Sequence, residues 1–244
     1  MSAGGALLRL DGVGKRFGRV TVAAGITLEV GAGQAVGIVG PNGAGKSSLF
    51  GLISGDLAPD SGRVLFDGAD VTALDPAARC RLGVGRTYQI PRPFAGMTTF
   101  ENVLLAAEQG AALRGPAASE LALSTLVRTG LLRFANQPAS SLTLLQRKRL
   151  EVARALATRP RLLLLDEVAG GLTDAEVAVL VEIVRGIRAG GITVVWIEHV
   201  VRALTSTVDR LLCLADGRVV ADGNPGEVLA SDTVKGVYLG SLSS

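Results

Sequence analysis

The chain has 244 residues, of which 48% are hydrophobic and 19% charged, a balance that excludes a disordered protein. Its 32 glycines follow no three-residue period, and Cys80 and Cys213 are too far apart for a CxxC motif or a disulfide framework. The net charge of +3 comes without a Lys/Arg run, and aromatic residues are only 4%, so we expect no nucleic-acid partner.

No apolar stretch reaches the roughly 18–20 residues that a membrane span needs. The first residues also lack the basic start and the apolar core of a signal peptide. We therefore expect a cytoplasmic protein, for which a membrane role would come through a partner.

Short apolar segments dominate the start of the chain. The runs Leu7–Val13 and Ile26–Val30 predict an antiparallel β portion, and Ala35–Val39 predicts a buried strand. A helix is predicted over Lys46–Ser54, and a turn then leads into a strand at Arg63–Phe66.

The middle of the chain is helical in pattern. Apolar residues recur at three- and four-residue spacing in Glu101–Gln109, Ser119–Leu132 and Gln146–Thr158. Little strand character separates them, and the alternation of strands and helices resumes afterwards. This block therefore predicts a helical subdomain inserted into a single domain.

Strand character returns with the apolar run Arg161–Asp166, followed by an amphipathic helix over Asp174–Arg188 and a buried strand over Ile192–Ile197. The segments Leu211–Leu214 and Arg218–Ala221 flank a turn and predict a hairpin. Buried strands that alternate with helices favour a mostly parallel sheet covered on both faces.

The clearest motif is a glycine-rich loop between the strand at Ala35–Val39 and the helix at Lys46–Ser54, and it fits GxxxxGK[ST]. Its amide groups can cradle phosphates at the positive end of the helix. Lys46 can reach the β- and γ-phosphates, and Ser47 can ligate Mg²⁺. The predicted nucleotide-binding residues of the loop are Gly40, Pro41, Asn42, Gly43, Ala44, Gly45, Lys46, Ser47 and Ser48.

Two carboxylates, Asp166 and Glu167, follow the apolar strand that ends the helical block. Ligands sit at the carboxyl ends of strands in open α/β sheets. We predict that Asp166 holds Mg²⁺ through water and that Glu167 polarises the attacking water. His199, the single histidine, follows the next buried strand and is predicted to lie near the γ-phosphate.

With these motifs the sequence resembles the nucleotide-binding subunit of an ABC transporter over nearly its whole length. The resemblance implies an α/β fold of the P-loop NTPase (RecA-like) type, with ATP and Mg²⁺ as cofactors. It implies one domain over 1–244, with a core at about 1–92 and 158–244 and a helical subdomain at about 93–157.

The resemblance also assigns residues. Phe17 is similar to the aromatic residue that stacks on adenine, with an ordinary core phenylalanine as the alternative. Gln89 matches the glutamine that contacts Mg²⁺ and the attacking water and signals to the membrane subunit. His199 matches the switch histidine. Glu167, His199, Gln89 and Lys46 are therefore the predicted catalytic residues, with Ser47, Gln89 and Asp166 at the metal.

The chain departs from the family pattern at two places. The signature segment, usually LSGGQ, reads Leu142-Thr143-Leu144-Leu145-Gln146, so both glycines are leucines. In the family this segment binds the γ-phosphate held by a partner subunit, and leucine adds bulk where backbone must approach closely. The predicted partner-nucleotide residues are Thr143, Leu144, Leu145 and Gln146. The proline that usually follows the catalytic glutamate is Val168.

Three stretches resemble the ATPases of branched-chain amino acid importers. They are Arg86–Ile90 with Arg92–Phe94, Glu101–Val103, and the ending Val237–Gly240. The partners implied are a second ATPase subunit, a transmembrane permease and, indirectly, a periplasmic or surface solute-binding protein, with the chain on the inner face of the cell membrane. The second ATPase subunit is expected to be a paralogue, with a homodimer as the alternative.

Other functions stay open at this point. Lipopolysaccharide-export ATPases share the length and the ending. A soluble ABC ATPase of translation or DNA repair usually has two cassettes or a long coiled coil, which this sequence lacks. A nucleotide-binding subunit without turnover is favoured only by the altered signature.

Overall fold

The computed structural model describes residues 5–240, and for the last two of these it describes the backbone alone. The first four residues of the segment considered as a signal peptide lie outside the described residues. In this part of the chain, no helix combines the length and the apolar character needed to cross a membrane.

The strands are β1 (Ala6–Phe17), β2 (Val20–Gly31), β3 (Ala35–Val39), β4 (Ser61–Phe66), β5 (Ala69–Asp70), β6 (Val84–Arg86), β7 (Leu162–Asp166), β8 (Thr193–Ile197), β9 (Arg210–Ala215) and β10 (Arg218–Gly223). The helices are α1 (Lys46–Ser54), α2 (Pro76–Leu82), α3 (Thr99–Gln109), α4 (Gly115–Arg128), α5 (Leu144–Ala157), α6 (Asp174–Ala189), α7 (Val201–Thr205), α8 (Pro225–Ala230) and α9 (Asp232–Gly240), with 3₁₀ turns η1 (Leu132–Phe134) and η2 (Ala139–Ser141).

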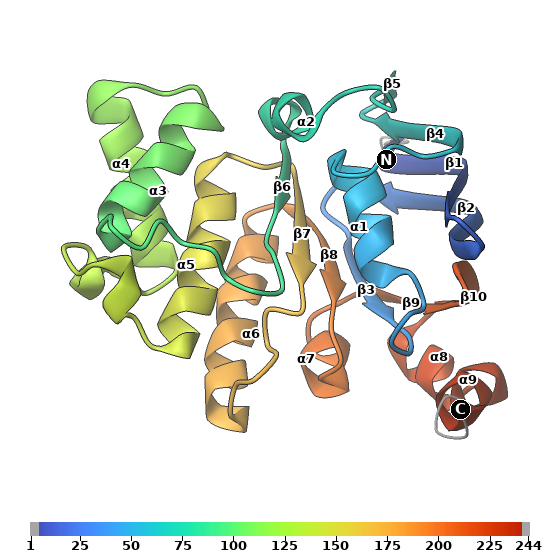
Figure 1. Cartoon of the computed structure of the whole chain (residues 1–244). Helices are drawn as coiled ribbons and strands as arrows, with labels where there is room; N and C mark the ends of the chain where they lie inside the picture. The colour runs from blue at the N-terminus through green and yellow to red at the C-terminus, as the bar shows by residue number, and fades with distance from the viewer. Residues whose placement is uncertain (1–4, 241–244) are drawn as a thin grey trace.

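A six-stranded sheet forms the centre of the molecule, in the order β10-β9-β3-β8-β7-β6 (Figure 1). Strands β6, β7, β8, β3 and β9 are parallel, and β10 pairs antiparallel to β9. All five residues of β3, β7 and β8 are buried, which is why these strands read as continuous apolar runs.

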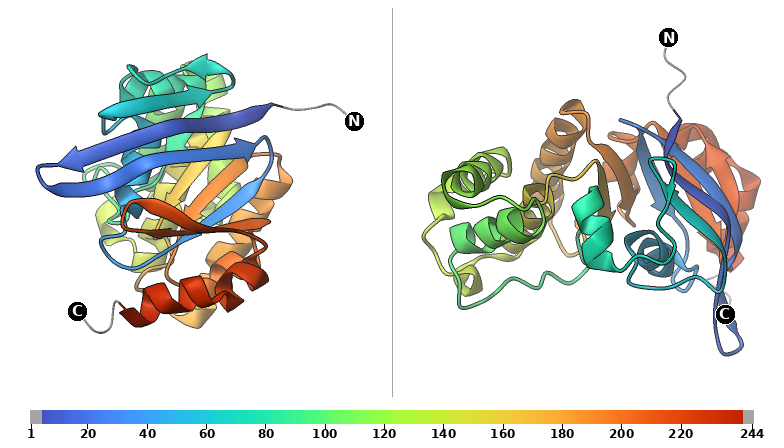
Figure 2. Two further views of the ribbon diagram at one scale, coloured as in Figure 1. Left: turned by 90° about the vertical axis from the view of Figure 1, so that its right-hand side faces the viewer. Right: turned by 90° about the horizontal axis from the view of Figure 1, so that it is seen from above.

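A second sheet, β2-β1-β4-β5, is antiparallel and lies on the side of α1 away from the parallel strands (Figure 2). Between the two sheets, Leu8, Leu10 and Phe50 belong to one buried apolar cluster. The opposite face of the six-stranded sheet packs on α6 through residues such as Leu180 and Trp196. The predicted α/β class, with an antiparallel N-terminal portion and a mostly parallel core, is confirmed.

Helices α3, α4 and α5 form a body of their own at the edge of the six-stranded sheet (Figures 1 and 2). Its buried centre includes Val103, Leu126 and Leu150. Helix α5 also places Val152 and Leu156 in the core against the sheet, so it joins the helical body to the rest of the domain.

Several elements differ from the sequence-based expectation. Strands β1 and β2 extend to a hairpin turn at Gly18-Arg19, beyond the apolar runs that predicted them. The helix expected over residues 119–132 is instead α4, which begins with Gly115-Pro116, a favourable first turn for a helix. Elements β5, α2, β6, α7, α8 and α9 were not predicted, because seven or fewer residues carry too little periodicity in most of them.

Candidate nucleotide-binding and hydrolysis site

The glycine-rich loop follows β3 and is held closely by two other strands. A Cβ on Gly40 would lie 2.1 Å from the carbonyl oxygen of Leu214, and one on Gly45 would lie 2.2 Å from that of Val22. Both glycines have positive φ values, +153° and +98°. Only glycine fits at these positions, so the loop is shaped by its neighbours as well as by its own sequence.

Lys46 begins α1 and folds back over the loop. Its Nζ donates to the carbonyl oxygens of Gly40 and Pro41 at 2.8 and 2.9 Å, and its side chain is buried. Burial lowers the pKa of Lys46, while the nearby carboxylates of Glu167 and Asp166 act in the opposite direction. The ammonium therefore lies against the glycine-rich loop at the start of α1, where a phosphate bound by the loop would be its natural partner.

Asp166 ends β7 and is buried beside Arg86 of β6. An Arg86 guanidinium nitrogen lies 3.1 Å from Asp166 Oδ2, and another lies 2.8 Å from Asp56. Burial raises the pKa of Asp166, and Arg86 opposes that shift. The second oxygen of Asp166, Oδ1, is buried without a hydrogen-bond partner.

This orphaned oxygen bears on the predicted metal site. Ser47, Gln89 and Asp166 line one depression of about 410 Å³. Among the described residues there is no cluster of three His, Cys, Asp or Glu side chains that would form a self-sufficient metal site. Mg²⁺ at nucleotide sites uses only one or two protein ligands, together with phosphates and water. The residues present therefore fit Mg²⁺ bound with a nucleotide.

Glu167 lies where three segments meet. Gln89 Nε2 donates to Glu167 Oε2 at 2.5 Å, and His199 Nε2 lies 2.8 Å from Glu167 Oε1. Gln89 follows β6, Glu167 follows β7 and His199 follows β8, so adjacent parallel strands bring the three side chains together. Glu167 itself has a φ of +46°, a left-handed backbone that is unusual for a residue other than glycine.

Phe17 lies at the tip of the β1–β2 hairpin. Its side chain is 49% exposed, and the Lys15 ammonium lies 5.5 Å from the ring centroid. The alternative of an ordinary core phenylalanine is therefore excluded. An exposed ring on the sheet that flanks the loop is available to stack on a planar ligand.

The signature segment begins α5. Thr143 is its N-cap, and the Thr143 and Gln146 side chains form a reciprocal capping box. Leu144 occupies the first turn and is 38% exposed. The structure places Thr143, Leu144, Leu145 and Gln146 together at the start of α5, with Gln146 bonded back to Thr143.

Sequence reasoning missed three charged residues around this site. Arg86 pairs with Asp166, Glu198 accepts a hydrogen bond from the Ala169 amide, and Lys148 donates to the Gln89 and Glu167 carbonyls. Each had a signal in the sequence: Lys148 falls on the buried face of α5, Glu198 directly follows an apolar strand, and Arg86 lies three residues before Gln89.

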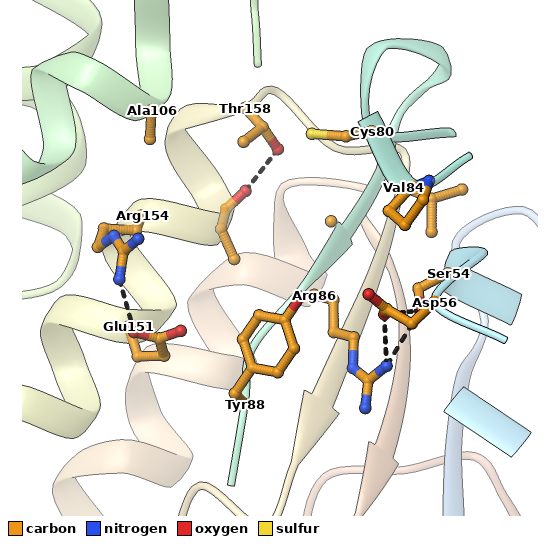
Figure 3. Close-up of a pocket in the computed structure, with 13 residues that line it drawn as sticks. Ser54, Asp56, Cys80, Val84, Arg86, Tyr88, Ala106, Glu151, Arg154 and Thr158 are labelled. Carbon is orange, nitrogen blue, oxygen red and sulfur yellow. Dashed lines mark hydrogen bonds and ion pairs between the residues drawn. The ribbon is translucent and has the colours of Figure 1, made fainter. Parts of the chain in front are cut away.

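A separate cavity of about 190 Å³ lies between the core and the helical body. Figure 3 shows Arg86 turned toward Ser54 and Asp56 on one side of it, and Arg154 toward Glu151 on the other, with Tyr88 between them. None of the predicted site residues lines this cavity. It is therefore a feature of the junction between the two bodies and not part of the nucleotide loop.

The fold and the site define a P-loop nucleotide-binding domain with an inserted helical body. Residues 23–170 match the family model described as ABC transporter. The chain belongs to this family as an ABC transporter ATP-binding protein, an ATPase that works with permease subunits.

Curated relatives cover almost the whole chain. It is 34% identical to the high-affinity branched-chain amino acid transport ATP-binding protein BraF of Pseudomonas aeruginosa, over 96% of this chain and 98% of the relative. It is 35% identical to the lipopolysaccharide export system ATP-binding protein LptB of Acidithiobacillus ferridurans, over 96% and 97%.

Solved cassettes agree with the fold. An ATP-binding cassette of an ABC transporter in its ADP conformation superposes with a TM-score of 0.85 at 29% identity, over 96% of this chain and 99% of that one. A dimeric cassette in a post-hydrolysis state with ADP and Pi superposes with a TM-score of 0.80 at 26% identity, over 89% and 98%.

Proposed function

We propose that Glu167 orients and polarises the water that attacks the γ-phosphate of ATP. The observation that carries this role is the position of its carboxylate between Gln89 and His199, one residue beyond the buried Asp166. Phosphoryl transfer depends mainly on positioning and on electrostatic stabilisation. The Lys46 ammonium would balance negative charge on the phosphates, and His199 would lie beside the γ-phosphate.

Ser47, Gln89 and Asp166 are proposed to hold Mg²⁺, directly or through water. Bound Mg²⁺ would supply the positive charge that neutralises the β- and γ-phosphate oxygens. The unpaired Oδ1 of Asp166 supports this assignment, because a buried carboxylate oxygen without a partner has a desolvation cost that a water ligand would remove.

The transporter that this ATPase powers is proposed to be an importer of the branched-chain amino acid type, on the inner face of the cell membrane. BraF and the E. coli LivG protein, both named for branched-chain amino acid transport, support the assignment at 34% and 33% identity over 96% of this chain. A solute-binding protein on the other side of the membrane would deliver the substrate.

Lipopolysaccharide export is the second candidate, because the LptB relative is equally similar. Purification of the chain with its native membrane partners, followed by mass identification, separates the two. Importer permeases and a solute-binding protein that binds branched-chain amino acids would support the first proposal. Partners of a lipopolysaccharide exporter would support the second and overturn the first.

The permease is proposed to dock beside the segment that follows Gln89. Ile90 and Phe94 are exposed there, and Arg154 lies 5.1 Å from the Phe94 ring. Asn102 accepts from the Phe94 amide and donates to its carbonyl, so a side chain of α3 anchors the segment. A groove of about 400 Å³ runs from Phe94 to α2 along α3, next to the cavity of Figure 3.

The working dimer is proposed to be a heterodimer with a paralogue that has an intact signature. Leu144 and Leu145 stand at the start of α5, where a partner's γ-phosphate would approach the amide groups of the first turn. A homodimer would carry this bulk at both composite sites. In a heterodimer, the site built on this chain's Lys46, Asp166, Glu167 and His199 would meet an unaltered signature.

A further inference from the structure

Two buried residues of opposite charge lie on either side of the turn that follows β7. Lys148 of α5 and Glu198, the residue after β8, are 5% and 1% exposed. Neither is part of the predicted machinery. A buried charge needs compensation, and here each residue has one hydrogen bond to a backbone group of the same short turn, Glu167–Ala169.

Lys148 holds the beginning of the turn. Its Nζ donates to the carbonyl oxygen of Glu167 at 3.1 Å and to that of Gln89 at 2.8 Å. The Glu167 carbonyl also accepts from the Gly170 amide at 3.2 Å. One ammonium therefore fixes the backbone of the two residues whose side chains meet at 2.5 Å.

Glu198 holds the end of the turn. Its Oε1 accepts from the Ala169 amide at 2.5 Å and from the indole of Trp196 at 3.3 Å. Its other oxygen accepts from the amide of His199 at 3.2 Å. The side chain of His199 in turn contacts the Glu167 carboxylate. Both oxygens of the Glu198 carboxylate therefore accept hydrogen bonds from donors near the ends of β7 and β8.

The turn needs this support because its backbone is unfavourable. Glu167 has a φ of +46°. The next residue is Val168 and not proline, so no pyrrolidine ring fixes the φ angle there. Such conformations persist only where the surroundings determine them. Released from Lys148, the turn could relax, and the Glu167 carboxylate would leave its position between Gln89 and His199.

We propose that Lys148 and Glu198 are positioning residues that hold the Glu167–Ala169 turn from opposite sides. Lys148 also links α5, which begins at the signature segment, to Gln89 and Glu167. A displacement of α5 would therefore be passed directly to the catalytic carboxylate. This inference rests on the proposed roles of Glu167 and Gln89.

The test compares Lys148→Met with Arg149→Met in the chain purified with its partner subunits. Arg149 is the matched control, because its Nε donates to the Thr129 carbonyl at 2.6 Å inside the helical body, away from the site. We expect Lys148→Met to lower kcat between about tenfold and 100-fold with KM for ATP nearly unchanged, since a small misplacement costs that much. Arg149→Met should lower thermal stability and keep kcat.

Two further variants test whether the cation itself is needed and whether its effect acts through Gln89. Lys148→Arg, which keeps a cation with several donors, should recover much of the lost kcat. In a Gln89→Ala background, Lys148→Met should have a smaller effect than alone, because one of its two contacts acts through Gln89. Equal kcat for Lys148→Met and the wild type, or equal loss in Arg149→Met, would overturn the proposal.

Hydrogen–deuterium exchange gives a readout that does not depend on turnover. Lys148→Met should speed exchange in peptides covering residues 167–172, and Arg149→Met should speed it around residue 130 instead. Unchanged exchange at 167–172 would also refute the proposal. If Lys148→Met fails to fold, Lys148→Gln, which keeps one amide donor, takes its place. Glu167→Gln is measured in parallel: if it retains turnover, the role of Glu167 is wrong, while the exchange result still decides whether Lys148 holds the turn.

Discussion

Leu144 lies against the backbone of Gly171: its Cδ2 atom would be 3.3 Å from a Cβ placed on that glycine. Leu144 opens α5, and Gly171 belongs to the loop between Glu167 and α6. Within one chain, the altered signature therefore packs on the loop that leads away from the catalytic carboxylate. Gly171 also has a φ of +78°, so both its conformation and its contact with Leu144 favour glycine.

Replacing Gly171 with alanine should destabilise the protein by about 1–2 kcal/mol, from the left-handed backbone alone. For a chain of this size that corresponds to a fall in Tm of roughly 2–8 °C. The crowding against Leu144 adds to this, so the same substitution in a Leu144→Gly background should cost less. Thermal unfolding of the four proteins measures the difference. Identical costs in both backgrounds would mean that Leu144 does not press on residue 171.

Restoring glycine at both 144 and 145 tests the heterodimer. We expect weak ATP hydrolysis by the isolated chain and a clear rise in phosphate release after the double substitution, because bulk is removed where the partner's γ-phosphate approaches. Leu123→Gly, at an exposed leucine of α4, controls for the roughly 1 kcal/mol cost of glycine in a helix. The proposal fails if the isolated chain already hydrolyses ATP as fast as the complete transporter and the restored glycines change nothing.

Glu167→Gln should bind ATP normally, lose turnover by at least about 100-fold and trap a closed dimer. The amide keeps the size of the side chain but removes the carboxylate that polarises water, and general-base catalysis contributes roughly 10²–10⁴-fold. Phosphate release and size-exclusion chromatography with ATP measure the two effects. Near-normal phosphate release from this variant would show that Glu167 does not polarise the attacking water.

Phe17→Ala should weaken ATP binding by about 1–2 kcal/mol, by analogy with the stacking of bases on aromatic side chains. The fold should be unaffected, because the ring is half exposed. Val20→Ala, at the exposed residue that pairs with Phe17 across the hairpin, controls for the loss of an apolar side chain without a ring. Nucleotide titration checks both variants, and an unchanged affinity for Phe17→Ala would rule out a stacking role.

Phe94→Ala and Arg92→Ala should lower transport more than basal ATP hydrolysis. Phe94 lines the groove proposed for the permease, and Arg92 is exposed two residues before it, so their loss should affect docking before catalysis. Transport into vesicles and phosphate release are measured on the same preparation. A matching loss of both activities, accompanied by a lower Tm, would point to misfolding of this segment and against a docking role.

The sequence alone predicted those parts of the protein whose signal is local. The glycine-rich loop, the buried strand ending in Asp166-Glu167 and the strand before His199 each carry their chemistry within a few residues of a recognisable element. Parallel strands then bring their carboxyl ends to one edge, so the joint position of these residues followed from the predicted class of sheet.

Other features depended on which segments the fold makes neighbours. Arg86 and Asp166 pair across 80 positions of the chain, and Lys148 reaches Gln89 across 59. No periodic pattern records such contacts, because they depend on strand order and on where α5 packs against the sheet. The left-handed backbone of Glu167 also depends on tertiary contacts, since only the surrounding residues make that conformation favourable. The sequence determined which groups could do the chemistry, whereas the tertiary structure decided how they are held, because burial and hydrogen bonding between distant segments set those positions.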